Sequence, residues 1–349
     1  MFKQSLIYMT SIKKIAATII PEGGTILITG ASGLIGTCLV DVFYSANMYY
    51  GKHFTIYALS RDSDKLKILF DKKKDVCCVA QNVAEPITIA NIDYIVHTAS
   101  IADPVSYARF PVETILTNVL GAKNVLDYCK ANNTRALLTS TFEVNGKLEQ
   151  DNYKENEYGT VDLNLIRSCY PESKRTAEML FKSYWDEYGV DCLIARLPSV
   201  YGPTMHKNDS KAQSQFLRNA IAGKDIVLKS KGTQRRSYCY VMDIISGIIF
   251  LLFKGKTGDI YNIANEFSVT SIYELAQTIA YYSNLKVVFE SPSEIERKGF
   301  SKPQNCILNT KKINDLGWKG MYDLNSGIKE TLDIMQEWFK GKHDILKEN

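Results

Sequence analysis

The sequence is poor in the residues that build metal centres, disulfide frameworks and membrane spans. It contains four histidines, none of them at metal-ligand spacing, and eight cysteines without a C-x-x-C pair, most of them within apolar runs. This pattern predicts buried, reduced thiols in a cytoplasmic protein and no metal site. The most apolar long segment, from Val241 to Phe253, is too short to span a bilayer and contains Asp243, so we expect a core helix there.

Charge of one sign is also scarce. The net charge is +4 over 349 residues, and the lysines and arginines are scattered along the chain. Nothing in this distribution favours nucleic-acid binding. Hydrophobic residues make up 45% and charged residues 23% of the chain, as in ordinary globular proteins. The length suits one α/β domain with a smaller lobe.

The first 20 residues mix basic and apolar side chains and lack the uninterrupted apolar stretch of a signal peptide. Lys13 and Lys14 lie among isoleucines, including Ile12 and Ile15. This pattern predicts an amphipathic helix that packs on the first domain or at a subunit contact. A helix on a membrane surface is the less favoured alternative, and membrane insertion is not expected.

A glycine-rich stretch from residue 29 to residue 36 organises the chain. It follows the apolar run from Thr25 to Ile28 and precedes a helix-like pattern, so strand, tight turn and helix follow one another. Gly30 permits the turn, Gly33 lets backbone N–H groups approach a pyrophosphate, and Gly36 lets the helix pack on the sheet. We predict a dinucleotide site here, with Ser32, Leu34 and Ile35 completing the loop.

A second strand is expected at residues 54–59, and its end distinguishes the two nicotinamide dinucleotides. An acidic residue there binds the ribose hydroxyls of NAD, whereas this chain has Ser60 followed by Arg61. A guanidinium that can pair with phosphate oxygens favours NADP(H). Asp62 keeps NAD(H) open as the alternative, because a shift of two residues would restore an acidic contact.

Further strand-like runs alternate with helix-like segments. Strands are expected at residues 76–80, 94–97 and 136–140, and a long helix is expected from Val112 to Cys129. This alternation predicts a doubly wound, mainly parallel sheet with right-handed crossovers. His97, at the end of one run, is interpreted as a packed structural residue.

Tyr170 and Lys174 stand four residues apart at the start of a helix-like segment, so they share one helical face. A nearby ammonium group favours the phenolate and would lower the pKa of Tyr170 from its ordinary value of about 10. Thr141, at the end of the fifth strand, offers a hydroxyl to the substrate oxygen. We therefore predict that Tyr170 exchanges a proton while a nicotinamide exchanges a hydride at the same carbon, with Lys174 also holding the nicotinamide ribose.

These motifs resemble the extended short-chain dehydrogenase/reductase superfamily. The segments around Arg167–Tyr170, Tyr201–His206 and Gln234–Arg236 resemble the UDP-glucuronate decarboxylases and, more loosely, the dTDP-glucose 4,6-dehydratases. The resemblance covers most of residues 25–340. It implies a Rossmann-type fold with a smaller C-terminal substrate-binding lobe, a nucleotide-linked sugar as substrate, and a homodimer built from two long helices.

The resemblance also assigns residues. It implies cofactor contacts from Asn82, Val83, Ala99, Asn118 and Pro198, and substrate contacts from Thr141, Phe142, Ser199 and Arg236, of which Arg236 binds the pyrophosphate. It implies a helical extension over residues 1–24, an NAD(P)-binding domain over 25–199 and 238–263, and a nucleotide-sugar-binding lobe over 200–237 and 264–349.

The chain departs from this family pattern after the fifth strand. The dehydratases have Thr-Asp-Glu and the decarboxylases Thr-Ser-Glu, whereas this chain has Thr141-Phe142-Glu143. Phenylalanine cannot transfer a proton, so elimination of water loses its acid. Glu143 is a candidate for proton transfer or for orienting the substrate. Asn145 replaces a tyrosine that is usual in the family.

Three hypotheses follow. The favoured one is an NADPH-dependent reductase of a dTDP- or UDP-linked 4-keto-6-deoxy sugar, serving the synthesis of surface polysaccharides such as lipopolysaccharide O-antigen. The alternative is a UDP-glucuronate decarboxylase, 4-epimerase or 4,6-dehydratase with recycled NAD(P). For the decarboxylase or epimerase, Arg235 is the expected contact of the substrate carboxylate. A non-catalytic NADP-binding regulator is the third, more remote hypothesis.

Overall fold

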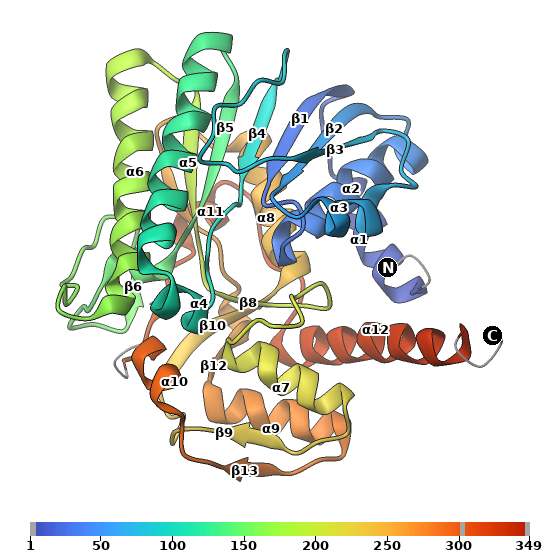
Figure 1. Ribbon diagram of the computed structural model, residues 1–349, viewed down its shortest axis with the longest axis vertical. Helices are drawn as coiled ribbons and strands as arrows, with labels where there is room; N and C mark the ends of the chain where they lie inside the picture. Colours follow the sequence, from blue (N-terminus) through green and yellow to red (C-terminus); the bar gives the residue numbers. More distant parts are fainter. Residues whose placement is uncertain (1–4, 301–303, 346–349) are drawn as a thin grey trace.

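A seven-stranded parallel β-sheet forms the centre of the computed structural model, which describes residues 5–300 and 304–345 (Figure 1). The order across the sheet is β11-β7-β5-β4-β1-β2-β3. Its strands are β1 (Gly23–Thr29), β2 (His53–Ser60), β3 (Val76–Ala80), β4 (Tyr94–His97), β5 (Arg135–Thr141), β7 (Cys192–Leu197) and β11 (Ile260–Asn262). The order reverses between β1 and β4: from β1 the chain adds β2 and β3 on one side, and it then crosses to the other side of β1 to form β4. The predicted doubly wound sheet is thus confirmed, and in such sheets ligands bind at this reversal.

Helices cover both faces of the sheet. Successive residues of a strand point to opposite faces, so the apolar strands present hydrophobic side chains on both sides. Leu27 packs toward α5 (Pro111–Asn132) and α6 (Cys169–Tyr188), which lie side by side in Figure 1. Ile26 and Ile28 belong to the core on the other face. There α2 (Leu34–Tyr50) contacts α8 (Val241–Lys254), the core helix predicted from its apolar run.

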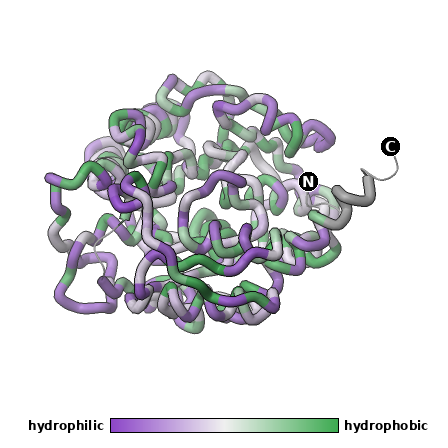
Figure 2. The backbone as a smooth tube through the Cα atoms, turned by 60° about the horizontal axis from the view of Figure 1, so that its bottom comes forward, coloured by the Kyte–Doolittle hydropathy of each residue, from purple (hydrophilic) through white to green (hydrophobic). Residues whose placement is uncertain are grey.

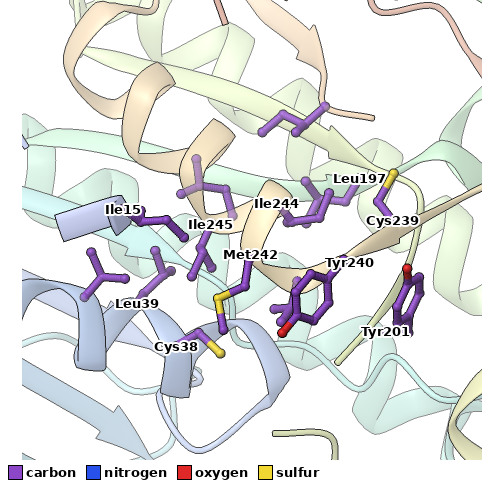
Figure 3. Packing of buried hydrophobic residues seen from close by; sticks show 14 of the residues in the cluster. Ile15, Cys38, Leu39, Leu197, Tyr201, Cys239, Tyr240, Met242, Ile244 and Ile245 are labelled. Carbon is purple, nitrogen blue, oxygen red and sulfur yellow. The ribbon is translucent and has the colours of Figure 1, made fainter. Parts of the chain in front are cut away.

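The predicted N-terminal helix is α1 (Leu6–Ala16), and it packs on the large domain. Its buried face includes Ile12 and Ile15, and α1 contacts α2, α8 and α12 (Leu324–Ile345). Figure 3 shows Ile15 in the same core as Leu39 of α2 and Ile245 of α8. Helix α1 is therefore part of the folded core. Residues 1–4 of the predicted extension lie outside the described residues.

A smaller lobe lies beyond the carboxyl ends of the strands (Figure 1). It contains a three-stranded sheet of order β12-β10-β8 and a parallel pair of β9 and β13. Its elements are β8 (Ser199–Tyr201), α7 (Ala212–Ile221), β9 (Ile226–Leu228), β10 (Arg235–Tyr240), β12 (Val269–Ser271), α9 (Ile272–Ser283), β13 (Val287–Phe289) and α10 (Glu294–Gly299). Helix α12 packs against α7, α9 and β10 and joins this lobe to α1.

The remaining elements are short. They are α3 (Ser63–Phe70), α4 (Pro104–Arg109), β6 (Asn152–Tyr153), β14 (Ile307–Leu308), α11 (Lys311–Asp315) and the 3-10 turns η1 (Phe142–Asn145), η2 (Ile166–Ser168) and η3 (Glu266–Ser268). The pairing of β6 with β14 joins the segment after β5 to the C-terminal part of the chain.

Among residues 5–300 and 304–345, no helix is long and apolar enough to cross a bilayer, and no cluster of histidine, cysteine and acidic residues could hold a metal ion. All eight cysteines lie within these residues and none is in a disulfide. Hydrophobic and hydrophilic stretches alternate along the backbone in Figure 2.

Candidate active site

A cavity of about 850 Å³ opens between the carboxyl ends of the strands and the smaller lobe. Its lining comes from the loop after β1, the end of β5, helices α4 and α6, strand β8 and the lobe elements β9, β10 and α10. The cavity has the size of sites that bind cofactors and drug-sized ligands. It is therefore the candidate active site.

The glycine loop forms the inner end of this cavity with a geometry that excludes larger residues. Gly30 has φ +67°, and a Cβ there would lie 2.8 Å from the Cα of Ala99. A Cβ on Gly36 would lie 2.3 Å from the Gly30 carbonyl oxygen. At Gly33 the closest atom to an added Cβ is that same oxygen, at 3.2 Å. Gly30 and Gly36 are thus required by packing, whereas an added Cβ at Gly33 would have only that oxygen within 4 Å. The predicted approach of a pyrophosphate to Gly33 stays a prediction.

The end of β2 lies beside this loop. The Ser60 and Ser32 hydroxyl groups are 2.7 Å apart, and Arg61 is exposed. Asp62 begins α3, since its carboxylate accepts the Lys65 N–H at 2.9 Å. The alternative in which Asp62 restores an acidic ribose contact therefore requires that carboxylate to leave its cap.

The structure brings Tyr170 and Thr141 together in the cavity. The two side chains are hydrogen-bonded, and Tyr170 is 8% exposed. The expected effect of Lys174 on Tyr170 is wrong for this structure, because the ammonium group donates to the carbonyl of Thr139 at 3.0 Å. Burial, followed by the charge of Glu143, instead raises the pKa of Tyr170. Burial also lowers the pKa of Lys174 to about 8, against the opposing charge of Glu178.

Two residues of the site, Arg167 and Tyr107, were not assigned a functional role from the sequence. Arg167 is buried, and its guanidinium donates to Glu143 at 2.7 Å and to the Tyr107 hydroxyl at 3.1 Å. The Tyr107 ring stacks on the Tyr170 ring, with centroids 5.3 Å and planes 12° apart. The position of Arg167, three residues before Tyr170, was the available signal, because helical spacing brings both near one site. Tyr107 lies on the six-residue helix α4 and carries no comparable signal.

Phe142 and Arg236 form the wall toward the smaller lobe. The Arg236 guanidinium carbon lies 5.7 Å from the centroid of the Phe142 ring, and Ser199 lines the same cavity. Arg235 does not serve as predicted for a substrate carboxylate. It is exposed, its guanidinium donates to the Val269 carbonyl, and it is not part of the lining. The side chains of adjacent residues in β10 alternate between faces, and of the two arginines Arg236 alone lines the cavity.

Most predicted site residues line the cavity: Gly30, Gly33, Leu34, Ile35, Gly36, Thr141, Phe142, Glu143, Tyr170, Lys174, Pro198, Ser199 and Arg236. The others lie outside the lining: Ser32, Arg61, Asn82, Val83, Ala99 and Asn118. Val83 is 3% exposed and packs near Gly121 of α5. Asn118 is buried, accepting from Ser100 at 2.8 Å and donating to Ser173 at 2.9 Å. The cofactor contacts of this second group stay predictions.

His97 is a packed structural residue, as expected. It is 1% exposed, and its Nδ1 lies 2.8 Å from the Thr29 hydroxyl. Burial, with a smaller effect of the Lys174 charge, lowers the pKa of His97 to about 3. The imidazole is therefore neutral at physiological pH.

A parallel doubly wound sheet, a glycine cradle at its reversal and a Tyr–Lys pair in the adjoining cavity define a dinucleotide-binding enzyme of the short-chain dehydrogenase/reductase type. The sequence pattern of the NAD dependent epimerase/dehydratase family matches residues 26–264. The chain belongs to this family, and the resemblance inferred from its motifs is confirmed.

Curated relatives are similar over nearly the whole chain. UDP-glucuronic acid decarboxylase 5 of Arabidopsis thaliana is 35% identical over 329 residues, which cover 92% of this chain and 91% of that protein. UDP-glucuronic acid decarboxylase 1 of Xenopus tropicalis is 30% identical over 316 residues, covering 89% of this chain and 72% of that protein.

Solved structures support the fold. A dTDP-glucose 4,6-dehydratase from Bacillus anthracis in complex with NAD has a TM-score of 0.74 at 22% identity and covers 92% of this chain and 98% of its own. A UDP-glucose 4-epimerase from Thermotoga maritima with UDP-glucose has a TM-score of 0.78 at 19% identity and covers 90% and 99%. At these identities the likeness establishes the architecture of both the sheet and the lobe.

Proposed function

We propose that the protein is a decarboxylase of UDP-glucuronate that recycles its nicotinamide cofactor within each turnover. The observation that carries this proposal is the combination of Phe142 with Tyr170, Thr141 and Glu143 in one cavity. Loss of carbon dioxide from a 4-keto uronic acid needs no acid at position 142, whereas elimination of water does. The similarity of the chain to UDP-glucuronic acid decarboxylases supports the same choice.

The residues of the cavity suit a bound dinucleotide. The cradle of Gly30 and Gly33 would hold the pyrophosphate, and Lys174 would hold the nicotinamide ribose. When bound, the cofactor accepts a hydride from the sugar C4 and later returns it. The protein residues supply the proton transfers and the charge stabilisation around that exchange.

In the proposed reaction, Tyr170 takes the proton of the C4 hydroxyl in its phenolate form, while Thr141 donates a hydrogen bond to the C4 oxygen. The Arg167 charge favours the phenolate, against burial and the Glu143 charge. The C5–C6 bond of the resulting β-keto acid then breaks, carbon dioxide leaves, and the electron pair forms an enolate at the C4 oxygen. Thr141 and Tyr170 stabilise that oxygen, and the Glu143 carboxylate, after taking up a proton from water, delivers it to C5. Tyr170 finally returns its proton when C4 is reduced, so no cofactor is consumed.

Two guanidinium groups line the cavity for an anionic substrate. Arg236 lies over Phe142 and would bind the pyrophosphate, whereas Arg167 lies beside Glu143. The apolar ring of Phe142 would shield the uronate carboxylate from water. A desolvated carboxylate is high in energy, and its loss as neutral carbon dioxide is thereby favoured.

The test is a product analysis without added cofactor. Purified protein is incubated with UDP-glucuronate labelled with ¹³C at C6, and both labelled carbon dioxide and a UDP-linked pentose are measured by NMR. The proposal expects both products in equal amounts, and neither from Tyr170→Phe. An epimer of UDP-glucuronate as the only product would overturn it in favour of a 4-epimerase.

A second candidate is the NADPH-dependent reductase of a 4-keto-6-deoxy nucleotide sugar, in surface-polysaccharide synthesis. Ser60 and Arg61 favour this reading, because an enzyme that consumes reducing equivalents commonly draws on NADPH, and Arg61 is exposed at the end of β2. Stoichiometric loss of NADPH absorbance with a dTDP- or UDP-linked ketosugar, together with no reaction on UDP-glucuronate, would replace the first proposal by this one. NADP(H) is our proposed cofactor in either case, with NAD(H) as the alternative.

We also propose a homodimer formed through α5 and α6. A row of apolar side chains on α5 is exposed, including Val112 at 61%, Leu116 at 47% and Leu120 at 38%. Met179 on α6 is 63% exposed. Contiguous exposed apolar surface of this kind favours association, and two copies of a two-helix surface form a four-helix bundle.

A further inference from the structure

Arg167 occupies a bridging position in the cavity. One of its terminal nitrogens donates to both the Glu143 carboxylate and the Tyr107 hydroxyl. The Arg167 and Glu143 side chains are 11% and 19% exposed, so water screens their charges only weakly. Substitution of only one member of a buried ion pair lowers stability strongly, because the charge of the other member stays buried without a partner.

Tyr107 connects this ion pair to the proposed proton-transferring tyrosine. Its hydroxyl accepts from Arg167, its ring stacks on Tyr170, and its carbonyl accepts from the Cys169 thiol at 3.5 Å. The guanidinium also lies 5.6 Å from the centre of the Tyr107 ring. These contacts connect α4 to η2 and to the start of α6.

The groups facing the Tyr170 hydroxyl come from several elements. Thr141 ends β5, Glu143 lies in η1, Arg167 lies in η2 and Tyr107 lies in α4. Lys174, on the same helix as Tyr170, is engaged with Thr139. The Glu143 charge raises the pKa of Tyr170 and the Arg167 charge lowers it, so the two members of the ion pair act in opposite directions.

We propose that Arg167 and Tyr107 are positioning residues that hold Glu143 and Tyr170 in a fixed relationship, with Arg167 neutralising Glu143 and Tyr107 supporting the Tyr170 ring. The proposal rests on the proposed function only in assuming that Tyr170 and Glu143 exchange protons with the substrate. Neither Arg167 nor Tyr107 transfers a proton in this scheme.

The experiment compares five proteins by the pH dependence of kcat: wild type, Arg167→Met, Arg167→Lys, Tyr107→Phe and Tyr107→Leu. Arg109→Met serves as the control, because Arg109 is exposed on the same helix and outside the cavity. A misplacement of proposed catalytic groups commonly costs about 10²-fold in rate, and we expect that loss in kcat for Arg167→Met. The acid limb of its profile should move to higher pH, since an uncompensated Glu143 opposes the phenolate.

The conservative variants distinguish a loss of positioning from a general loss of folding. Arg167→Lys keeps the charge and should restore the acid limb to its wild-type pH and part of kcat. Tyr107→Phe keeps the stacked ring and should retain more activity than Tyr107→Leu. An Arg167→Met protein with an unmoved acid limb, or with kcat within twofold of wild type, overturns the inference. Activity losses that only follow lowered thermal stability also overturn it.

Assays of the wild type distinguish a failure of the proposed function from a failure of the positioning role. If it converts UDP-glucuronate, the variants test the positioning role in that assay; if it reduces a ketosugar instead, the same profiles are measured there. If it turns over neither, crystal structures of wild type and Arg167→Met decide. Unchanged positions of the Glu143 carboxylate and the Tyr170 hydroxyl in the variant would overturn the positioning role.

Discussion

The Lys174 ammonium group donates a hydrogen bond to the carbonyl of Thr139, at 3.0 Å, and the residue is 3% exposed. Its pKa is lowered to about 8, first by burial. Below that pH the folded protein carries a buried charge that the unfolded chain exposes to water. Ligand-free protein should therefore gain stability as the pH rises from 8 to about 10.4, the ordinary pKa of lysine.

The corresponding variant is Lys174→Met, which removes the titrating group and fills similar space. Relative to this variant, we expect wild type to gain about 2 kcal/mol of unfolding free energy between pH 8 and about pH 10.4. Thermal and urea unfolding at pH 7, 9 and 10 measure the difference, and Lys123→Met, on exposed helix surface, is the control. A wild-type-to-variant difference that is constant over this range would show that Lys174 titrates normally. Turnover should be lost in Lys174→Met at every pH.

The glycine loop makes a second prediction, in which two similar substitutions have different effects. Gly36→Ala places a Cβ 2.3 Å from the Gly30 carbonyl oxygen, so we expect a loss of about 1–3 kcal/mol of stability. Gly33→Ala meets that oxygen only at 3.2 Å, so it should fold normally but bind NADP(H) about tenfold more weakly. Thermal unfolding and calorimetric titration measure the two quantities. Equal effects of both variants on stability would contradict this division of roles.

The buried pair of Arg196 and Glu178 makes a third prediction. Arg196 is fully buried, donates to both oxygens of Glu178, and also donates to the Glu155 carbonyl at 2.9 Å. Removal of one partner, as in Glu178→Leu, should cost about 3–5 kcal/mol because the arginine charge stays buried alone. The double variant Arg196→Met/Glu178→Leu should recover part of this loss. Urea unfolding checks both, and an additive double variant would rule out the coupling.

The central sheet and the location of the site could be predicted from the sequence for a physical reason. Apolar runs of four to eight residues mark the strands of the sheet, and β3 and β4 have the predicted bounds. Strand β4 is largely buried within the sheet, whereas β3 is an edge strand and partly exposed. Since parallel strands end at one edge, residues after β1 and β5 lie at the same end of the sheet, and Gly33 and Thr141 line one cavity there.

The interior of the site was less predictable, because it depends on side-chain conformations and irregular segments. Helical spacing placed Lys174 on the face of Tyr170 but did not reveal that Thr139 offers a carbonyl to the ammonium group. Glu143 and Arg167 are separated in the sequence by an irregular segment that contains β6. That segment is held by contacts such as Arg175 with the Val144 and Gly159 carbonyls, which no periodic pattern marks.

The exposed apolar row on α5 makes a fourth prediction, about assembly. In Leu116→Glu/Leu120→Glu two carboxylates replace side chains that are 47% and 38% exposed. If α5 and α6 form the dimer contact, these charges would be buried without partners, and the variant should be monomeric by light scattering. Met48→Glu, which is 56% exposed on α2, should leave the oligomeric state unchanged. A monomeric wild type, or a dimeric double variant, would exclude this interface.

The end of β2 makes the last prediction, about cofactor choice. Ser60 is within 2.7 Å of Ser32 of the glycine loop, and Arg61 is exposed beside it, so a 2′-phosphate on the adenosine ribose would find a hydroxyl-lined and positively charged edge. Arg61→Ala should weaken NADP(H) binding about tenfold, the equivalent of one phosphate contact of about 1.4 kcal/mol, and leave NAD(H) binding unchanged.

Ser60→Asp should act in the opposite sense, because its carboxylate repels the 2′-phosphate and accepts hydrogen bonds from the ribose hydroxyls of NAD(H). Fluorescence titration with the two reduced cofactors gives the ratio of dissociation constants for each variant. Lys67→Ala, an exposed lysine on α3, is the control for loss of surface charge alone. A parallel change in both dissociation constants on substitution of Arg61 would mean that its charge acts on the shared pyrophosphate or on the overall potential. Discrimination would then lie with the carboxylate of Asp62, released from its cap on α3.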